Sequence, residues 1–436
     1  MTDGMMTNIR KVTVNVCRIL LAATFIFSGL VKAVDPLGTQ YKIHDYAVAM
    51  GIEQFIPDYL TLSASVLLSA LEFTIGILLL FATHRHTVSK IALLVMGIMT
   101  PVTLWLAIDD PVSDCGCFGD ALKLTNWQTF YKNIVLLAAT LTVWKYPQDM
   151  PRFISRSNQW IVVNFTILFT LTMSVYCLYD LPMFDFRPYH VGANIPKGME
   201  IPPGAQQPVF DTKVIMEKNG KRKDMTLTEY EKVAEDSTWK YIDIRNVEVV
   251  KGYVPSIHDF SIVKTDGTDI TDSVLTDKNY TFLLVSPHLE YADDSNIDRI
   301  NEIYDYAHDN GYAFYCLTAS DAKAVSRWTD ITGAEYPYCT TDETTLKTII
   351  RSNPGLVLIK DGTIIRKWSH NRLPDMTEMN GRLDKTEMGH IEDNSVTRRI
   401  TIILLWFVLP LALLTFADRT WAWTKWLKRK RKNINV

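Results

Sequence analysis

The chain has 436 residues, of which 47% are hydrophobic, and its formal net charge at pH 7 is −3. This length leaves room for two or three domains, and a charge so close to neutral argues against a nucleic-acid partner. Hydrophobic residues gather toward the two ends of the chain, whereas the middle is polar. The six cysteines are too few for a protein stapled by disulfides, so each is judged by its own surroundings.

Six apolar runs have about the 20 residues needed to cross the hydrocarbon core of a membrane. They cover residues 12–33, 60–82, 91–108, 127–146, 160–179 and 400–416. The first run is not expected to be a cleaved signal peptide, because Ser28, Lys32 and Asp35 stand where a small-residue cleavage site would lie. We therefore predict a polytopic α-helical membrane protein with about six spans.

Basic residues predict the orientation of these spans. Lys and Arg gather before the first run, between the second and third, between the fourth and fifth, and after the sixth. The positive-inside rule makes these flanks cytoplasmic, so both termini are expected in the cytoplasm and residues 180–397 outside. Arg398 and Arg399 fall on the outer side, against the rule. The basic residues at 425–432 on the cytoplasmic side outweigh them. The lipid bilayer is thus an expected partner, with the basic tail at its surface.

Cys115 and Cys117 form the only tight cysteine pair in the chain and lie between two apolar runs. A disulfide between residues two apart closes a small, strained ring that is easily reduced, which favours reversible exchange over a permanent crosslink. Lys32, at the outer edge of its span, could lower the pKa of either thiol. A metal site is disfavoured because the loop offers no further Cys or His. A structural turn built on Gly116 and Gly119 remains an alternative.

Two ionisable residues fall inside predicted spans, where charge is costly and usually functional. Glu72 lies near the middle of the second span, and Lys132 lies a turn and a half inside the fourth. Lys132 could reach outward or pair with Glu72, and a role in proton handling is equally open. Glu72 joins Cys115 and Cys117 as a candidate catalytic residue, and Lys32 and Lys132 are candidate supporting residues.

The remaining cysteines have two interpretations each. Cys177, at the outer end of the fifth span, could resolve a disulfide of the Cys115 loop or simply fill apolar space. Cys316 and Cys339 are expected on neighbouring strands, where they form either a second thiol pair or ordinary core residues. Cys17 is expected to be a small apolar residue of its helix.

The N-terminal third resembles the four-helix membrane module of the DoxX and MauE families. The resemblance rests on FIFSGLVK at 25–32, Asp35-Pro36, Glu72, CGCFG at 115–119 and residues 127–133. It implies a bacterial cytoplasmic (inner) membrane protein linked to redox processes or to maturation of a disulfide-rich periplasmic enzyme. Residues 1–150 are then the membrane domain, and residues 151–182 supply a fifth transmembrane helix.

The polar middle divides into several parts. Residues 183–253 are predicted to be a β-rich connector with a hairpin at Asn219-Gly220. Strands and helices alternate over residues 254–375, which predicts a sheet covered by helices. A linker at 376–397 then leads to the sixth transmembrane helix and the basic tail at 398–436.

Residues 254–375 resemble a thioredoxin-like domain of the peroxiredoxin or TlpA kind. The likeness rests on the entry strand IHDFS at 257–261, on Asn353-Pro354 where the family has a cis-proline, and on a hairpin at Asp361-Gly362. Pro354 is therefore a candidate supporting residue. The sequence departs from the family at 286–291, where SPHLEY contains no reactive cysteine, and its final helix is short or missing. The domain is accordingly expected to serve as a docking surface.

These features favour a membrane protein of thiol–disulfide redox or periplasmic protein maturation, with Cys115 and Cys117 as the exchange pair. A noncatalytic scaffold or assembly factor that docks a partner through the thioredoxin-like domain is the alternative. A transporter is a weaker third, since no internal repeat is visible. An extracytoplasmic protein partner is expected. No cofactor is evident in the sequence, and a quinone or other electron acceptor has no motif to support it.

Overall fold

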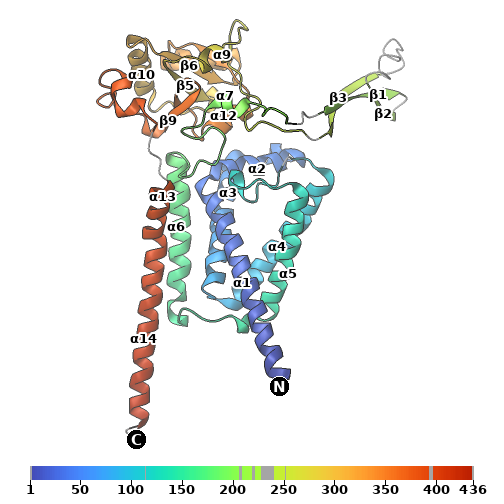
Figure 1. The fold of residues 1–436 in the computed structure, drawn as a ribbon, viewed down its shortest axis with the longest axis vertical. Coiled ribbons are helices and arrows are strands. Elements are labelled where there is room, and N and C mark those ends of the chain that lie inside the picture. The colour runs from blue at the N-terminus through green and yellow to red at the C-terminus, as the bar shows by residue number, and fades with distance from the viewer. Residues whose placement is uncertain are drawn as a thin grey trace.

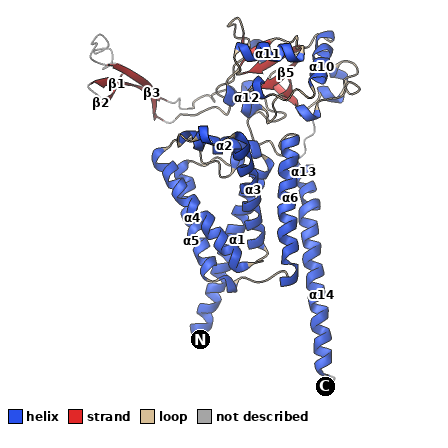
Figure 2. Ribbon diagram, turned by 180° about the vertical axis from the view of Figure 1, so that it is seen from behind, coloured by secondary structure: helices blue, strands red, loops and turns tan. Residues whose placement is uncertain are grey.

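The computed structural model describes residues 2–112, 114–205, 209–218, 221–226, 240–250, 252–391 and 396–434. A helical module lies below a mixed-sheet domain, and a small separate sheet projects to one side (Figure 1). Both chain ends lie at the end of the helical module opposite the sheet domain (Figure 2).

The helical module consists mainly of long helices. Six of these helices precede the sheet domain: α1 Thr2–Val34, α2 Pro36–Ala49, α3 Asp58–Leu80, α4 Arg85–Asp109, α5 Asn126–Lys145 and α6 Gln159–Tyr179. After the sheet domain the chain returns to the module through α13 Val396–Ile403, the π-helical turn Leu404–Val408 and α14 Leu409–Ile434. The helix α2 begins at the Asp35 cap and lies across the end of the bundle beneath the sheet domain (Figure 1).

Five of these helical segments are long and apolar enough to cross a membrane: Met5–Val34, Asp58–Leu80, Arg85–Asp109, Arg156–Tyr179 and Val396–Leu427. The predicted fourth span corresponds to α5, which has 20 residues but is too polar to be counted with them. Its length of about 30 Å nevertheless equals the thickness of the hydrocarbon core, and it packs along α4 and α1. Buried Asn133 donates a hydrogen bond of 3.1 Å to Thr103 of α4, so part of its polarity is satisfied inside the module.

Small residues let α1 and α3 approach closely. A Cβ atom on Gly29 would lie 2.3 Å from the backbone nitrogen of Phe73, and one on Gly76 would lie 2.6 Å from that of Ile26. Small side chains at such crossings are typical of helices packed within a membrane, where close backbone contact replaces the hydrophobic drive. This contact sets the position of Glu72 on α3 against the outer half of α1.

The last helix closes the module on the side of α6. Phe407 lies in the π-helical turn, with its ring 4.4 Å from that of Phe169 and 5.7 Å from that of Phe165, both on α6. Its ring is also 5.2 Å from that of Phe73 on α3. The two helices that enter and leave the extramembrane part of the chain are thus neighbours.

The small sheet has the order β2-β1-β3, with β1 Val209–Lys218, β2 Lys221–Thr226 and β3 Lys240–Val250. Lys218 pairs with Lys221, which gives the hairpin register that Asn219-Gly220 predicts. The two turn residues themselves lie outside the described part of the chain.

The larger sheet has six strands in the order β4-β7-β6-β5-β8-β9. Their bounds are β4 Val263–Lys264, β5 Tyr280–Ser286, β6 Ala313–Thr318, β7 Tyr338–Thr340, β8 Gly355–Lys360 and β9 Thr363–Ser369. β5, β6 and β7 are parallel, whereas β8 and β9 form an antiparallel hairpin beside β5. The helices are α7 Ile195–Met199, α9 Thr271–Leu275, α10 Ile297–Asp309, α11 Ala322–Thr332 and α12 Glu343–Ile349.

Alternating residues of the central strand β5 divide the core into two layers. Phe282 and Leu284 face one cluster, which also holds Ile300 of α10 and Trp328 of α11. Leu283 and Val285 face the other, which holds α9 and α12 residues. This two-sided burial explains why β5 is a continuous apolar run, as parallel strands covered on both faces usually are.

The observed order of elements agrees with the thioredoxin-like expectation. The Asn353-Pro354 peptide is cis and directly precedes β8, and the β8–β9 hairpin turns at Asp361-Gly362. The predicted entry strand at 257–261 is wrong: these residues form no strand, and the short β4 Val263–Lys264 follows them, although Ile257 and Phe260 are buried. As expected, the described residues from 370 to 391 contain short 3-10 turns and no closing α-helix.

Replacing Gly29 by Val should destabilise the helical module, because its side chain would collide with the backbone of Phe73. Overpacking of this kind costs about 1–3 kcal/mol, so the unfolding midpoint in detergent should fall. Gly97→Val is the matched control, since the space around a Cβ atom at Gly97 is open. Equal midpoints for the two variants would contradict the proposed close contact of α1 and α3.

Candidate functional site

The two paired cysteines lie in the loop between α4 and α5, on the side of the helical module that faces the sheet domain. Gly116 and Gly119 have φ angles of +63° and +51°, the left-handed region that glycine adopts without strain. The resulting tight turn brings the sulfur atoms of Cys115 and Cys117 to 2.7 Å, with both residues present as thiols. Cys115 is buried and Cys117 is half-buried. The contact between the two thiols therefore depends on the shape of this turn.

A buried lysine fixes the backbone of this turn. The Lys32 ammonium donates to Ser28 Oγ at 2.7 Å, to Glu72 Oε2 at 2.7 Å and to the carbonyl oxygen of Cys117 at 2.8 Å. All three ammonium protons thus have acceptors, as a buried lysine requires. The Ser28 hydroxyl lies 2.7 Å from both Glu72 Oε2 and the Cys117 carbonyl. Residues of α1 and α3 therefore hold the cysteine turn in place.

The ion pair of Glu72 corrects one alternative drawn from the sequence. Glu72 pairs with Lys32 rather than with Lys132, and both members of that pair are buried. Lys132 instead lies with its amine 4.2 Å from the centre of the Phe118 ring, a cation–π contact with the residue that follows Cys117. Its place on the second turn of α5 makes it reach the loop and not α3. Both lysines thus approach the cysteine turn, from two sides.

The two thiols have opposite acidities. A hydrogen bond from the Cys115 thiol, helped by the positive charges of Lys132 and Lys32 and opposed by burial, lowers the pKa of Cys117 to about 7. The same hydrogen bond, together with burial, raises the pKa of Cys115 well above its ordinary value. The thiolate is the nucleophilic form of cysteine. Cys117 is therefore the thiol of the pair that favours the thiolate form, and Cys115 is the one that keeps its proton.

The helix α2 supports the other side of the turn. The Tyr46 hydroxyl donates to the carbonyl of Cys115, and Lys42 forms an ion pair of 3.2 Å with Asp114. Asp114 in turn accepts a hydrogen bond of 2.8 Å from the backbone N–H of Gly116. Since Lys42 also lies against Gly116, a side chain there would strike it at 2.9 Å. The backbone carbonyls of both cysteines thus accept hydrogen bonds, that of Cys117 from α1 and that of Cys115 from α2.

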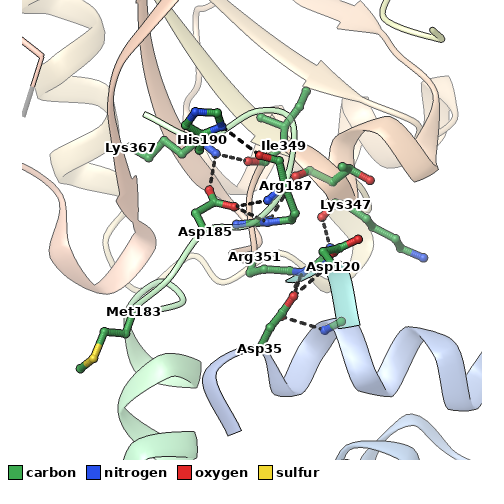
Figure 3. Close-up of polar contacts among 12 residues, drawn as sticks. Asp35, Asp120, Met183, Asp185, Arg187, His190, Lys347, Ile349, Arg351 and Lys367 are labelled. Atoms are coloured by element: carbon green, nitrogen blue, oxygen red, sulfur yellow. Dashed lines mark hydrogen bonds and ion pairs between the residues drawn. The ribbon is translucent and has the colours of Figure 1, made fainter. Parts of the chain in front are cut away.

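Arg351 of the sheet domain contacts the same loop (Figure 3). Arg351, which follows α12, is only 6% exposed and contacts Asp35 at 3.0 Å and Asp120 at 3.4 Å. Asp35 caps α2, and Asp120 lies three residues beyond Cys117. The guanidinium also lies 5.2 Å from the ring centre of Tyr41 on α2. Its two carboxylate partners raise the pKa of Arg351 against the effect of burial, so the charge is retained.

A buried charge cluster contacts the end of α12, shortly before Arg351. Asp185, in the segment that leaves α6, pairs with Lys367 of β9 at 3.0 Å and with Arg187 at 2.7 Å. Lys367 also donates to the carbonyl of Ile349 at 2.6 Å, at the end of α12 (Figure 3). Burial opposes ionisation of Asp185, but these two cations outweigh it and lower its pKa. Burial lowers the pKa of Lys367 to about 8, with Asp185 opposing.

A cavity of about 550 Å³ lies between the helical module and the sheet domain. Gly116 of the cysteine turn lines it, together with residues of α2, the segment after α6 and α12. The charged lining side chains are Asp35, Lys42, His44, Asp45, Asp114, Asp120, Lys123, Arg187, His258, Asp259, Asp342, Glu343, Lys347 and Arg351. This volume is in the range of ligand pockets, and its wall combines polar and apolar surface.

The sheet domain carries no thiol where β5 ends. Ser286 donates a hydrogen bond of 2.6 Å to Asn353, which donates one of 2.8 Å to the carbonyl of His288. His288 itself lies 2.9 Å from Glu343 of α12. Pro354 thus lies beside a hydrogen-bonded polar cluster. Thiol chemistry at this point of the fold is absent from the described residues, as the sequence indicates.

The structure separates the other cysteines from the pair. Cys177 is buried with Ala33, Val34 and Met173 in a cluster of its own, which does not include the Cys115 turn. The suggested second pair is wrong: Cys316 lies opposite Tyr338, and Cys339 lies opposite Leu317. Because neighbouring positions alternate across a sheet, Cys316 and Cys339 face opposite core layers. Burial raises the pKa of Cys316, and also that of Cys339 to about 11, as for inert core thiols.

Residues 10–146, which contain the cysteine turn and its supporting helices, match the family described as methylamine utilisation protein MauE. This N-terminal part of the helical module is a MauE-family membrane domain. The match covers the four helices that the resemblance to DoxX and MauE implied. The chain is accordingly a multi-pass membrane protein that associates with the lipid bilayer.

Residues 210–251, which include the small sheet, match a domain of unknown function, DUF8463. No curated protein matches the chain. Among solved structures, a candidate protein disulfide isomerase from Bacteroides thetaiotaomicron has 18% identity and a TM-score of 0.21, covering 34% of this chain and 84% of that one. A candidate thioredoxin from Neisseria meningitidis has 14% identity and a TM-score of 0.23, covering 28% and 82%. Scores this low add nothing to the strand order and the cis-proline, on which the thioredoxin-like assignment rests.

Sequence reasoning missed Arg351, Asp120 and Tyr46, which connect the cysteine turn to the sheet domain and to α2. Asp35 entered the sequence analysis only through the signal-peptide argument and a family motif, without a partner. An arginine directly before Ser352-Asn353-Pro354 was a usable signal, because the segment before a cis-proline in this fold lies near the end of β5. Nothing in the sequence pairs that arginine with carboxylates more than 200 positions away.

Alkylation of Cys117 should be half-maximal near pH 7, because the thiolate fraction rises as the pH passes its pKa. An ordinary cysteine responds at about pH 8.5. Lys132→Met should shift the midpoint upward, whereas Lys132→Arg should keep it. Rates measured with a mass-tagged thiol reagent on reduced protein, with Cys17 as internal reference, test this. Identical midpoints in wild type and Lys132→Met would contradict the electrostatic role of Lys132.

Arg351→Ala should loosen the cysteine turn without unfolding the helical module, because Asp35 and Asp120 lose their shared partner. Loss of charge-assisted hydrogen bonds costs about 1.5–3 kcal/mol, so backbone amide exchange at residues 114–120 should accelerate by at least about tenfold. Arg382→Ala is the control, since Arg382 forms an exposed pair within the sheet domain. Unchanged exchange at 114–120 in Arg351→Ala would refute the connection.

Proposed function

We propose that this protein carries out thiol–disulfide exchange with extracytoplasmic protein partners in a bacterial inner membrane. One observation carries the proposal: two thiols lie in contact beside a cavity shared by a membrane module and a thioredoxin-like domain, and one of them has a lowered pKa. The pKa of Cys117 near 7 leaves about half of it as thiolate at neutral pH. A purely structural turn has no need of that acidity.

The exchange is balanced between two protein dithiol–disulfide couples. The Cys117 thiolate attacks one sulfur of a partner disulfide, and the partner's other sulfur leaves as a thiolate that takes up a proton. Cys115 then loses its proton and attacks Cys117, which forms the Cys115–Cys117 disulfide and releases the second partner thiol. The pair has given two electrons to the partner. A second protein dithiol returns them by the same steps in reverse.

The strained ring of a Cys-X-Cys disulfide suits such a carrier. A bridge between residues two apart is more easily reduced than an unstrained structural disulfide. Glu72 and Lys32 hold the Cys117 carbonyl, so the turn keeps its shape while the sulfurs change partners. Their roles are to position the turn and, for Lys32, to favour the thiolate. A membrane quinone could replace the second dithiol as the other redox partner.

The thioredoxin-like domain serves in this proposal to hold the partner. It lacks a cysteine after β5, yet Arg351 docks it onto the cysteine loop and its residues form one wall of the cavity. A partner segment in the cavity would contact both domains. The charge distribution of the sequence and the placement of both termini at one end of the bundle support an extracytoplasmic sheet domain with cytoplasmic termini (Figure 2).

The absence of a cysteine after β5 also favours the second candidate, a noncatalytic assembly factor that docks its partner through the sheet domain. The two functions differ in what they require of the thiols. If the protein is a scaffold, a chain with both Cys115→Ser and Cys117→Ser will complement a deletion fully.

Cys115→Ala should accumulate a mixed disulfide between Cys117 and a partner protein, because the thiol that would release the partner is gone. Cys117→Ala should trap less, since Cys115 is the more buried thiol and burial still raises its pKa without Cys117, whereas Lys132 and Lys32 still favour the Cys117 thiolate. Non-reducing electrophoresis after acid quenching measures the adducts, with Cys17→Ala as the control for a thiol outside the site. Equal trapping by the two variants would overturn the assignment of Cys117 as the attacking thiol, and no trapping by either would favour the scaffold.

A further inference from the structure

A second cavity, of about 300 Å³, lies in the loops at the far end of the helical module from the cysteine turn. Two loops distant in sequence form it: the α3–α4 turn supplies His84, Arg85 and His86, and the α5–α6 connection supplies Arg152 and Arg156. Gln159, at the start of α6, completes the wall. Five basic side chains therefore converge on one space, and the lining contains no carboxylate.

The carboxylates nearest to these loops are already engaged. Asp149 forms an ion pair of 2.7 Å with Arg10. Asp418 of α14 accepts hydrogen bonds from the backbone of Ser155 at 2.8 Å and from Asn158 at 2.6 Å. An assembly of like charges such as the basic lining of this cavity is stabilised by a bound anion.

Arg85 shows that the convergence is built into the fold. Its guanidinium donates to the backbone carbonyls of Gln148, at 3.0 Å, and of Met150. It thereby ties the α5–α6 connection to the first residue of α4. The positive-inside rule accounts for the sign of the charge in these loops but not for their meeting around one cavity. The positive end of the α4 helix dipole adds to the same field.

We propose that this cavity binds the phosphate of an anionic phospholipid headgroup. Arg152 and Arg156 are exposed, so their planar guanidinium groups are available for paired hydrogen bonds to phosphate oxygens. Phe153 and Trp160 directly follow the cavity residues Arg152 and Gln159 in sequence. Their side chains are 38% and 62% exposed. Aromatic side chains of this kind gather at the level of lipid headgroups. The site thus offers cations for the phosphate beside apolar surface for acyl chains.

The test compares lipids bound to the full-length chain after reconstitution in nanodiscs that contain equal amounts of phosphatidylglycerol and phosphatidylcholine. Native mass spectrometry should find phosphatidylglycerol retained preferentially. The double variant Arg152→Gln/Arg156→Gln should reduce that preference by at least about tenfold, since each basic residue near an anionic surface contributes about fivefold in affinity. Lys90→Gln/Lys145→Gln is the matched control, with the same loss of charge at residues that do not line the cavity.

Three results would overturn the proposal. An equal fall in the control pair would show that general positive charge attracts the lipid. Equal retention of both lipids by the wild type would show no anion site. Displacement of phosphatidylglycerol by an equimolar amount of inorganic phosphate would assign the cavity to free phosphate instead. Thermal unfolding of each variant checks folding, and the Arg156→Lys variant, which keeps the charge, should retain most of the preference.

Discussion

The ammonium group of Lys32 is the constraint on which the cysteine turn depends. It is buried among Ser28, Glu72 and the carbonyl of Cys117, and each of its protons has one acceptor. Removing one partner of a buried ion pair costs about 3–5 kcal/mol, so Lys32 and Glu72 hold each other in place. Because the third acceptor is backbone of the thiol loop, the packing of α1 against α3 also determines where the sulfur atoms lie.

The same loop is fixed from three directions by different parts of the chain. Lys32 reaches it from α1, Tyr46 from α2, and Arg351 through Asp120 from the sheet domain. The sheet domain therefore has a structural connection to the thiols although it contributes no cysteine to them. The charge cluster around Lys367 contacts the carbonyl of Ile349, two residues before Arg351, so β9 supports the segment that carries this arginine.

Local patterns predicted the elements of this structure well, and pairings between distant residues poorly. The strands Tyr280–Ser286 and Gly355–Lys360 lie in the region 254–375 where alternating strands and helices are predicted, and the Asn353-Pro354 peptide is cis as the resemblance implies. The partner of Glu72 and the register that separates Cys316 from Cys339 could not be read from one sequence. Each depends on the rotation of a helix or the alignment of two strands, and a shift of one residue changes the outcome.

The sheet domain is attached to the membrane at both of its ends. The chain enters it from α6 and leaves it toward α14, and the aromatic contacts of Phe407 keep these two helices adjacent. When the Arg351 contacts open, the domain cannot diffuse away, so closing again is an intramolecular event with a high effective concentration. Two anchors at one corner also restrict the motion to a swing about that corner. Because of this double attachment, access to the thiols depends on the angle between the sheet domain and the helical module. It does not depend on the concentration of the protein in the membrane.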